Sequence, residues 1–392
     1  MEYKKLNELC EINIGKTPSR SKSQYWGEGI NWLSISDLKD KFIRKTREQI
    51  TNEAISECNM KIVPKDTVVM SFKLSIGKTA ILKEDMYTNE AIANFPIKNK
   101  ELFPEYLYYA IKTLNFDNTD RAVMGATLNK TKLNQLRIPY CKLEEQKKIV
   151  EILDKAQELI DKRKEQIQAL DELVKSQFIE MFGDPVSNPK GWKKVICKDI
   201  TSKIGSGATP SGGNSSYKEE GISLIRSMNV HNNKFIYKDL AFIDDEQAKK
   251  LKNVIIEEND ILLNITGASV ARSCIVPSAI IPARVNQHVS IIRCKHEEIL
   301  PVFLVYQFTN ESYQRKLWDI ATSGGATREA ITKQQLENLE LIVPPIEIQN
   351  KFIEFIKVND KLKFEMENSL KELEDNFNSL MQKAFNGELF SE

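Results

Sequence analysis

The segment 142–182 decides the fold and reads KLEEQKKIVEILDKAQELIDKRKEQIQALDELVKSQFIEMF. It contains no glycine or proline, and apolar residues recur at alternating intervals of four and three, the spacing of a coiled-coil seam. Only two members are polar in the series Ile149, Leu153, Ala156, Ile160, Arg163, Ile167, Leu170, Val174, Gln177 and Met181. Gly183-Asp184-Pro185 supplies a stop. We therefore predict one helix over 142–183, roughly 60 Å long.

The same seam returns 203 residues later. The second series is Phe352, Ile356, Asn359, Lys363, Met366, Leu370, Leu373, Phe377, Leu380 and Ala384. Two helices with apolar stripes bury those stripes best against each other, so we predict an antiparallel coiled coil with pseudo-two-fold symmetry. The polar residues Asn359 and Lys363 are expected to fix its register. The alternative is that each helix packs on its own globular domain.

The chain outside the helices is also duplicated, with sequence offsets that climb from 189 to 203. The matched segments are 3–6 with 192–195 (YKKL, WKKV), 15–19 with 207–211 (GKTPS, GATPS), 66–72 with 260–266 (DTVVMSF, DILLNIT), 104–109 with 301–306 (PEYLYY, PVFLVY), 125–127 with 325–327 (GAT), and Gln146 with Gln349. Short apolar runs broken by Gly, Pro, Asn and Ser indicate an α+β fold for each copy. We predict globular domains over 1–141 and 184–345, with helices over 142–183 and 346–392.

Composition sets outer limits on function. The 392 residues include 56 Lys+Arg and 55 Asp+Glu, which leave a net charge of +1 and exclude both a globally basic binder and an acidic mimic of nucleic acid. A hydrophobic content of 41% supports substantial cores. The sequence lacks an apolar run of membrane-spanning length and an apolar signal-peptide core, and its six cysteines are widely separated. We expect a cytoplasmic protein with reduced thiols and no metal site.

Motifs for catalysis are missing from the sequence. Gly15-Lys16-Thr17 and Gly77-Lys78-Thr79 resemble the end of a phosphate-binding loop, but Cys10 and Phe72 stand where that loop needs another glycine. An amino-methyltransferase tetrapeptide, GxGxxG, HExxH and GxSxG are also absent. We predict a chain that is not an enzyme and that binds no cofactor.

Charge is distributed unevenly, because the repeated loops are locally basic and the acids concentrate in the helices. Backbone N–H groups, hydroxyls and cations in these loops suit contacts with DNA phosphates, and Arg and Asn side chains can read base edges. The candidate DNA-binding residues are Lys16, Thr17, Ser19, Arg20, Ser34, Ser36, Lys73, Lys78, Thr127 and Lys130 in the first copy, and Thr209, Ser211, Arg226, Asn229, His231, Thr266, Arg272, Thr327 and Arg328 in the second.

The duplicated arrangement resembles the DNA specificity subunit of type I restriction-modification systems. The G-x-T-P-S loops, the GAT loops, the PPIEIQ segment at 344–349 and the AFNGEL segment at 384–389 carry the resemblance, which covers essentially the whole chain. One departure is the first copy's PYCKLEEQ segment at 139–146, which lacks the double proline.

This resemblance implies that each globular domain reads one half of a bipartite DNA target and that the coiled coil sets the spacer. It implies docking of two modification subunits that bind S-adenosylmethionine, and of restriction subunits that use ATP and Mg. Since the loops of the two copies differ, we expect an asymmetric target. The alternatives are a helical scaffold that binds protein without DNA affinity, and an enzyme with an unrecognised motif.

Overall fold

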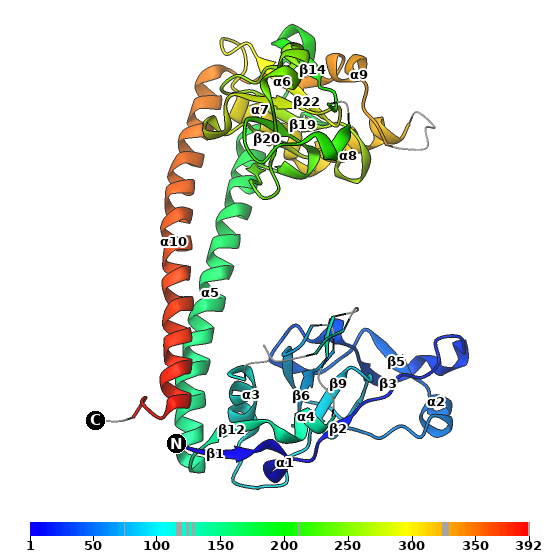
Figure 1. Cartoon of the computed structure of the whole chain (residues 1–392). Coiled ribbons are helices and arrows are strands. Elements are labelled where there is room, and N and C mark those ends of the chain that lie inside the picture. Colours follow the sequence, from blue (N-terminus) through cyan, green and yellow to red (C-terminus); the bar gives the residue numbers. More distant parts are fainter. Residues whose placement is uncertain are drawn as a thin grey trace. The chain divides into compact units, whose positions relative to one another are not determined.

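The computed structural model describes residues 1–73, 75–114, 120–122, 125–127, 130–210, 212–323 and 329–390. The chain divides into two compact units, which we call unit 1 (1–164 and 368–392) and unit 2 (165–367). Two long helices, α5 (Leu143–Phe182) and α10 (Ile346–Asn386), each contribute residues to both units (Figure 1). In the described part of the chain, no helix combines the length and apolar character needed to cross a membrane.

Unit 1 contains a five-stranded sheet of order β2-β9-β6-β7-β4, a three-stranded sheet β5-β3-β8, and the pairs β1-β12 and β10-β11. Its strands are β1 (Glu2–Lys5), β2 (Asn13–Ile14), β3 (Trp26–Leu33), β4 (Phe42–Ile43), β5 (Glu48–Ile50), β6 (Val68–Ser71), β7 (Thr79–Leu82), β8 (Tyr87–Thr88), β9 (Ile92–Phe95), β10 (Asp120–Ala122), β11 (Gly125–Thr127) and β12 (Arg137–Tyr140). Its short helices are α1 (Leu6–Leu9), α2 (Asn52–Glu57), α3 (Pro104–Lys112) and α4 (Lys130–Gln135).

Unit 2 contains a four-stranded sheet of order β14-β22-β19-β20, a three-stranded sheet β18-β15-β21, and the pairs β13-β23 and β16-β17. Its strands are β13 (Lys194–Ile196), β14 (Thr201–Ser206), β15 (Ile222–Ile225), β16 (Val230–His231), β17 (Lys234–Phe235), β18 (Ala241–Ile243), β19 (Ile261–Asn264), β20 (Ser273–Ile275), β21 (Ala283–Val285), β22 (Val289–Cys294) and β23 (Glu340–Ile342). Its short helices are α6 (Asp245–Lys250), α7 (Pro301–Thr309), α8 (Glu311–Thr322) and α9 (Lys333–Glu337).

The two units repeat one topology. The order β2-β9-β6-β7 corresponds to β14-β22-β19-β20, and β1-β12 corresponds to β13-β23. The centre strands of the smaller sheets also correspond, because β3 and β15 each pair antiparallel with one neighbour and parallel with the other. The predicted duplicated α+β fold is therefore confirmed.

The first sequence match is out of register by two residues. The Leu6 N–H donates to the Leu136 carbonyl, and the Cys197 N–H donates to the Leu339 carbonyl, both at 2.8 Å. Leu6 therefore corresponds to Cys197, an offset of 191, whereas the similarity of YKKL to WKKV gave 189. Identical lysines misled the alignment because they lie on or beside short edge strands, where side-chain identity is weakly constrained.

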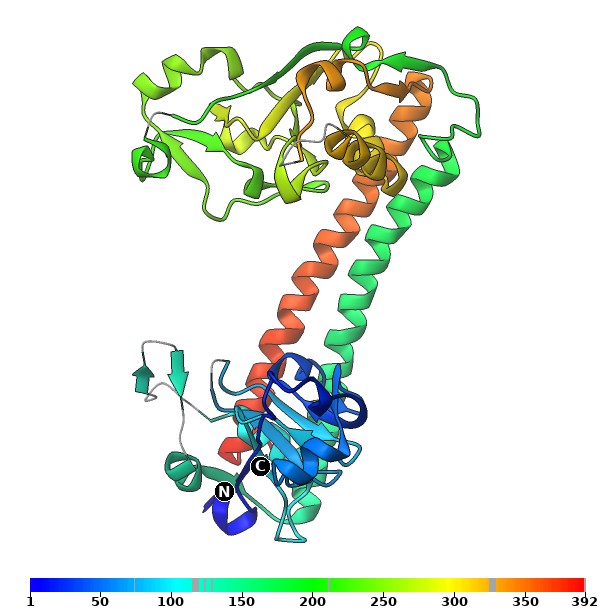
Figure 2. The ribbon, with the colours of Figure 1, turned by 90° about the vertical axis from the view of Figure 1, so that its right-hand side faces the viewer.

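The long helices pack antiparallel within each unit, and in both views they lie side by side there (Figure 1, Figure 2). In unit 2, Phe178 contacts Phe352, and the Asn359 amide, a register residue in the prediction, donates to the Leu170 carbonyl at 3.4 Å. In unit 1, Lys164 pairs with Glu374 at 2.9 Å. Every residue of the two predicted seams is buried or half-buried.

The helices also close the globular cores. In unit 2, Phe178, Phe182 and Phe352 share a cluster with Phe303 of α7. In unit 1, Ile149 and Leu153 of α5 share a cluster with residues of α3 and the end of α10. The packing thus combines both of the arrangements considered for the helices, because each helix contacts the other along its seam and also contributes side chains to the globular clusters.

A buried glutamine fixes the start of each long helix. The Gln146 side-chain oxygen accepts from the Phe103 N–H at 2.8 Å, while its amide nitrogen donates to the Glu101 and Cys141 carbonyls. Gln349 makes the same three bonds in unit 2, to the Leu300 N–H and the Glu298 and Pro344 carbonyls. Both side chains are fully buried. This shared packing role explains why the glutamine is repeated.

Candidate nucleic-acid interface

Each G-x-T-P-S loop begins at a glycine pressed against another strand. A Cβ at Gly15 would lie 2.2 Å from the Thr88 carbonyl oxygen, and a Cβ at Gly207 would lie 1.6 Å from that of Val285. A larger residue cannot occupy these positions without displacing backbone. The repeated glycine therefore places the loop beside β8 in unit 1 and beside β21 in unit 2.

The loop of unit 1 rests on two tryptophans. The indole N–H of Trp32 donates to the Lys16 carbonyl at 3.0 Å, and that of Trp26 donates to the Ser19 carbonyl at 3.2 Å. The Arg20 guanidinium lies 3.7 Å from the centre of the Trp26 ring and binds both carboxylate oxygens of Glu48. This pairing lowers the pKa of Glu48, opposed by partial burial. The aromatic platform and the ion pair hold Arg20 in a fixed orientation.

Two predicted cations of unit 1 come together at a cavity of about 620 Å³. Lys16 and Lys130 both line it, although they are far apart in the sequence, and Lys61 and Lys98 line it too. The Lys16 ammonium donates to the Cys58 carbonyl at 2.6 Å. Glu11 lines the cavity as well, and the four lysines still leave positive charge in excess, which makes this part of unit 1 attractive to phosphate.

A series of hydrogen bonds between polar side chains holds the loop of unit 2. The Thr209 hydroxyl bonds to the Gln287 amide, whose other end lies 3.1 Å from Nε2 of His288. Nδ1 of His288 lies 2.6 Å from the Thr266 hydroxyl. These hydrogen bonds link two of the predicted residues, Thr209 and Thr266, through Gln287 and His288, which the sequence did not single out.

Thr266 also touches the segment after the second GAT loop. It forms a β-bridge with Ala330, and the Gly267 N–H donates to the Glu329 carbonyl at 3.0 Å. The predicted Thr327 and Arg328 belong to 324–328, which lies outside the described residues. Three distant stretches of sequence, around 209, 266 and 329, thus meet in one region of unit 2.

Ser34 and Arg226 occupy equivalent positions in the two units. The Ser34 N–H donates to the Asp37 carboxylate at 2.9 Å, and the Arg226 N–H donates to the Asn229 side-chain oxygen at 3.0 Å. The Arg226 guanidinium also donates to the Asp239 carbonyl and faces the Tyr217 ring at 5.4 Å. Each residue precedes a short 3-10 helix, Ile35–Asp37 or Ser227–Asn229.

Asn229 requires a correction. The sequence suggested that it reads a base, but its side chain is fully buried. Its amide nitrogen donates to the Ile236 and Lys238 carbonyls, and its oxygen binds the Arg226 N–H. Since these bonds occupy the amide, Asn229 positions the Arg226 turn and has no edge left for a base.

The other predicted residues are dispersed. The Ser34 hydroxyl binds Asp37 and Ser36, Ser36 also accepts from Arg47, and the Ser19 hydroxyl binds Ser21. Thr17, Arg272 and His231 are half-buried. Lys73 and Lys78 lie in the turn between β6 and β7, which is no strand-to-helix phosphate loop. Thr127 ends β11, and Ser211 lies outside the described residues.

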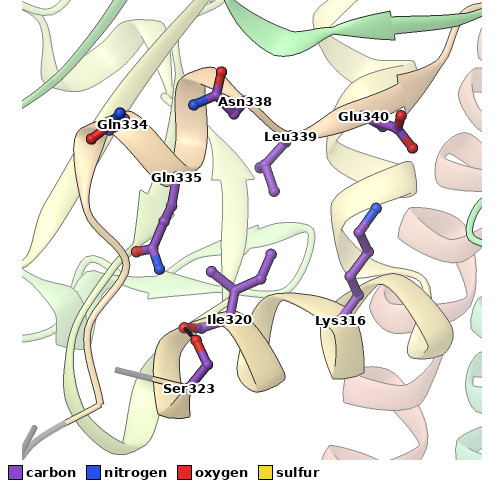
Figure 3. Close-up of a pocket in the computed structure, with 8 residues that line it drawn as sticks. All are labelled: Lys316, Ile320, Ser323, Gln334, Gln335, Asn338, Leu339 and Glu340. Atoms are coloured by element: carbon purple, nitrogen blue, oxygen red, sulfur yellow. Dashed lines mark hydrogen bonds between the residues drawn. The ribbon is translucent and has the colours of Figure 1, made fainter. Parts of the chain in front are cut away.

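A cavity of about 480 Å³ lies between α8 and α9 (Figure 3). Gln335 and Leu339 point into it from α9 and the residues that follow, Ile320 faces them from α8, and Lys316 extends from α8 toward Glu340. Burial lowers the pKa of Lys316, opposed by Glu340. The Ser323 hydroxyl donates to the Ile320 carbonyl at 2.8 Å, so this serine is not paired with a general base.

The thiols do not form a reactive centre either. All six cysteines are free, and burial raises the pKa of four of them to about 12. The four are Cys10, Cys197, Cys274 and Cys294. They are therefore protonated and unreactive at neutral pH. Within the described ranges, no cluster of three His, Cys, Asp or Glu side chains is arranged to hold a metal ion.

The family model for the Type I restriction modification DNA specificity domain matches residues 1–171 and 189–375. The chain belongs to this family. The type I restriction enzyme MjaIX specificity subunit of Methanocaldococcus jannaschii is 28% identical over 377 residues, which cover 90% of this chain and 84% of that protein. The EcoBI specificity subunit of Escherichia coli is 21% identical over 362 residues, covering 84% of this chain and 74% of that one.

The fold of this specificity-family chain is also found in a solved structure. A chain from "Structural basis underlying complex assembly and conformational transition of the type I R-M system" aligns with a TM-score of 0.65 at 16% identity, covering 99% of this chain and 98% of that one. At this identity the likeness concerns the fold alone. The family predicted from the duplicated motifs is thus confirmed.

Several residues of this specificity protein could be found only from the structure. Glu48 and Gln287 complete the Arg20 and Thr209 contacts, and Lys61 and Lys98 join Lys16 at the cavity. One sequence signal exists for Gln287, because Asn286-Gln287 stands where the first copy has Asn89-Glu90. Each asparagine accepts a backbone N–H from the residue two positions on, so the two turns are equivalent.

Proposed function

We propose that this chain reads a bipartite, asymmetric DNA target for a type I restriction-modification complex, one half-site by each unit. The observation that carries the proposal is a shared loop scaffold with different side chains on it. Gly15 and Gly207 anchor equivalent loops, yet unit 1 presents Arg20 bound to Glu48, whereas unit 2 presents Thr209 bound to Gln287. Equivalent loops that present different side chains favour two different half-sites.

The long helices are proposed to set the spacer. Readers of one DNA face dock about one helical turn apart, near 34 Å. Two helices of 40 and 41 residues with continuous seams are stiff enough to hold such a separation, which a flexible linker is not. The polar contacts of Asn359 and Lys363 support one register.

The helices are also the proposed docking surface for two modification subunits. On α10 within unit 2, Val358 is 72% exposed, Leu362 is 45% exposed and Phe364 is 60% exposed. Apolar side chains are seldom left in water in such a group unless a partner covers them. We propose that these partners hold S-adenosylmethionine, that restriction subunits hold ATP and Mg, and that this chain performs no catalysis.

Methylome sequencing tests the proposal directly. A host would express the chain with its modification subunits, and single-molecule reads would map methylated adenines. We expect one non-palindromic motif with two conserved halves around a fixed unspecified gap. A continuous or palindromic motif would contradict two different reading units.

A salt titration separates DNA reading from the scaffold alternative. The assembled complex is mixed with a duplex that carries the mapped motif, and binding is followed from low to high salt. We expect specific binding whose logarithm falls steeply with the logarithm of salt concentration, because phosphate contacts release counterions. A complex that binds no duplex under any of these conditions would favour the scaffold.

A further inference from the structure

Unit 2 contains a buried arginine with no acidic partner. Arg284, in the middle of β21, is only 8% exposed. One of its terminal nitrogens donates to the Ala283 carbonyl at 2.9 Å, while its Nε is buried without an acceptor. Among the described residues it forms no ion pair. A buried cation is costly unless an anion accompanies it, so this guanidinium requires an explanation.

Arg293 has the acidic partners that Arg284 lacks. It lies on β22 of the same unit, and its guanidinium binds both carboxylate oxygens of Asp260, at 2.7 and 2.8 Å, as well as Glu257. These contacts raise the pKa of Arg293, whereas burial lowers the pKa of Arg284. The fold thus neutralises one of two neighbouring arginines and leaves the other uncompensated.

Arg284 lines a cavity of about 430 Å³ beside α6. Lys249 and Lys252 line the same cavity, and its acidic wall residue is Asp245. Lys249 also pairs with Glu246 at 2.8 Å. Asp245 and Glu246 can neutralise two of the three cations Lys249, Lys252 and Arg284, so one positive charge remains in excess. Of these three cations, Arg284 is the buried one.

We propose that this cavity is a phosphate-binding site, in which the Arg284 guanidinium binds the anion and Lys252 supplies the second charge. A guanidinium matches the paired oxygens of a phosphate group, and a monoanionic phosphodiester would balance the excess charge. Unit 1 lacks the site, because the parallel pairing of β3 with β8 puts Tyr87 at the position that Arg284 takes beside β15.

The first test uses inorganic phosphate and no DNA, so its result does not depend on the proposed target reading. Thermal unfolding of the full chain would be compared in phosphate and in chloride at equal ionic strength. We expect phosphate to raise the Tm of the natural chain, because a ligand of the folded state stabilises it. The Arg284→Gln variant should lose this gain, and Lys252→Gln should keep only part of it.

Lys250→Gln is the matched control. It also removes one positive charge, two residues before Lys252 at the end of α6, but Lys250 does not line the cavity, so its phosphate response should equal that of the natural chain. Arg284→Lys, which keeps the charge and loses the forked donors, should show a smaller gain and covers the case in which the glutamine variant fails to fold. An undiminished phosphate response in both Arg284 variants would overturn the proposal.

A DNA-binding experiment with the same variants then identifies the source of the phosphate. If the DNA backbone supplies it, Arg284→Gln should flatten the dependence of log affinity on log salt by about one, equally for all sequences, and Lys250→Gln should not. If the slope is unchanged while the Tm effect is present, the site takes a free phosphate or a phosphate ester. Both outcomes support the site, and they differ only in its ligand.

Discussion

Gln287 shows how a single side chain can be prepared to read a base. A glutamine amide offers two donors and two accepting lone pairs. Thr209 takes one of the four positions and His288 takes another, and whichever way the amide is turned, one donor and one acceptor remain. Gln287 is exposed, and the remaining pair matches the N6 and N7 edge of adenine.

Replacement of Gln287 by leucine tests this reading. We expect a loss of about 1–3 kcal/mol in discrimination at one base pair of the unit 2 half-site, with the unit 1 half-site unaffected. Competition binding with duplexes altered one base pair at a time measures both effects. Gln334→Leu, which removes an exposed amide elsewhere in unit 2, is the control. Equal discrimination in Gln287→Leu and in the natural chain would exclude base reading by Gln287.

Arg226→Ala is the second residue-scale prediction. Arg226 is oriented by its contacts with Asp239 and Tyr217, so its removal should relax one position of one half-site at a cost of about 1–3 kcal/mol. The same competition assay distinguishes a base contact of Arg226 from a phosphate contact. A uniform loss across all sequences would make Arg226 a phosphate contact.

Residue types alone could not distinguish side chains that are free to contact a base from side chains that stabilise the fold. Asn229 and Arg226 are both good base readers by chemistry, and they are three residues apart. Whether an amide faces DNA or closes a turn depends on which carbonyls the fold brings near it, here Ile236 and Lys238. That information is tertiary, and the same is true of the Glu48 partner of Arg20.

At the scale of elements, the buried glutamines join each long helix to its sheet domain. Removing the Gln146 side-chain amide would leave one N–H and two carbonyls without partners in a buried place. We expect Gln146→Leu and Gln349→Leu each to lower the free energy of unfolding by about 2–4 kcal/mol. Urea denaturation of the full chain measures this.

Gln157→Leu provides the matched control for these variants. Gln157 lies half-buried on α5 and donates to the solvent-facing carboxylate of Asp161 at 2.9 Å, so its loss should change stability by less than about 0.5 kcal/mol. If all three leucine variants were equally stable, the buried hydrogen bonds would not join helix to domain as we describe.

The helices were predictable because their signal is long and periodic. Seam residues repeat over each of two segments, and the breaker Gly183 follows α5 directly. Short strands gave weaker signals. The edge strand β1 was matched two residues out of register, since its pairing depends on Arg137–Tyr140, more than a hundred residues away. Such partners cannot be read from a local pattern.

At the scale of the whole molecule, helix length should control the target. Deleting one heptad from each helix keeps both seams in phase and shortens each by seven residues. We expect the gap between the half-sites to shrink by about 3 base pairs. Methylome sequencing of a host with the shortened chain measures the gap. The Asn359→Leu variant, which keeps the length, should retain the natural gap, and an unchanged gap after the deletion would refute the spacer role.

The separate cores of the two units have a consequence for how target specificity diversifies. Each unit has its own apolar clusters and its own buried glutamine at the start of a long helix. The effects of substitutions in one unit on the free energy of unfolding are therefore expected to add to the effects of those in the other. A homodimer would have to change both halves of its target at once. Under the proposed reading of one half-site by each unit, first and second copies from different relatives can be combined, and the number of readable sites grows as the product of the two collections.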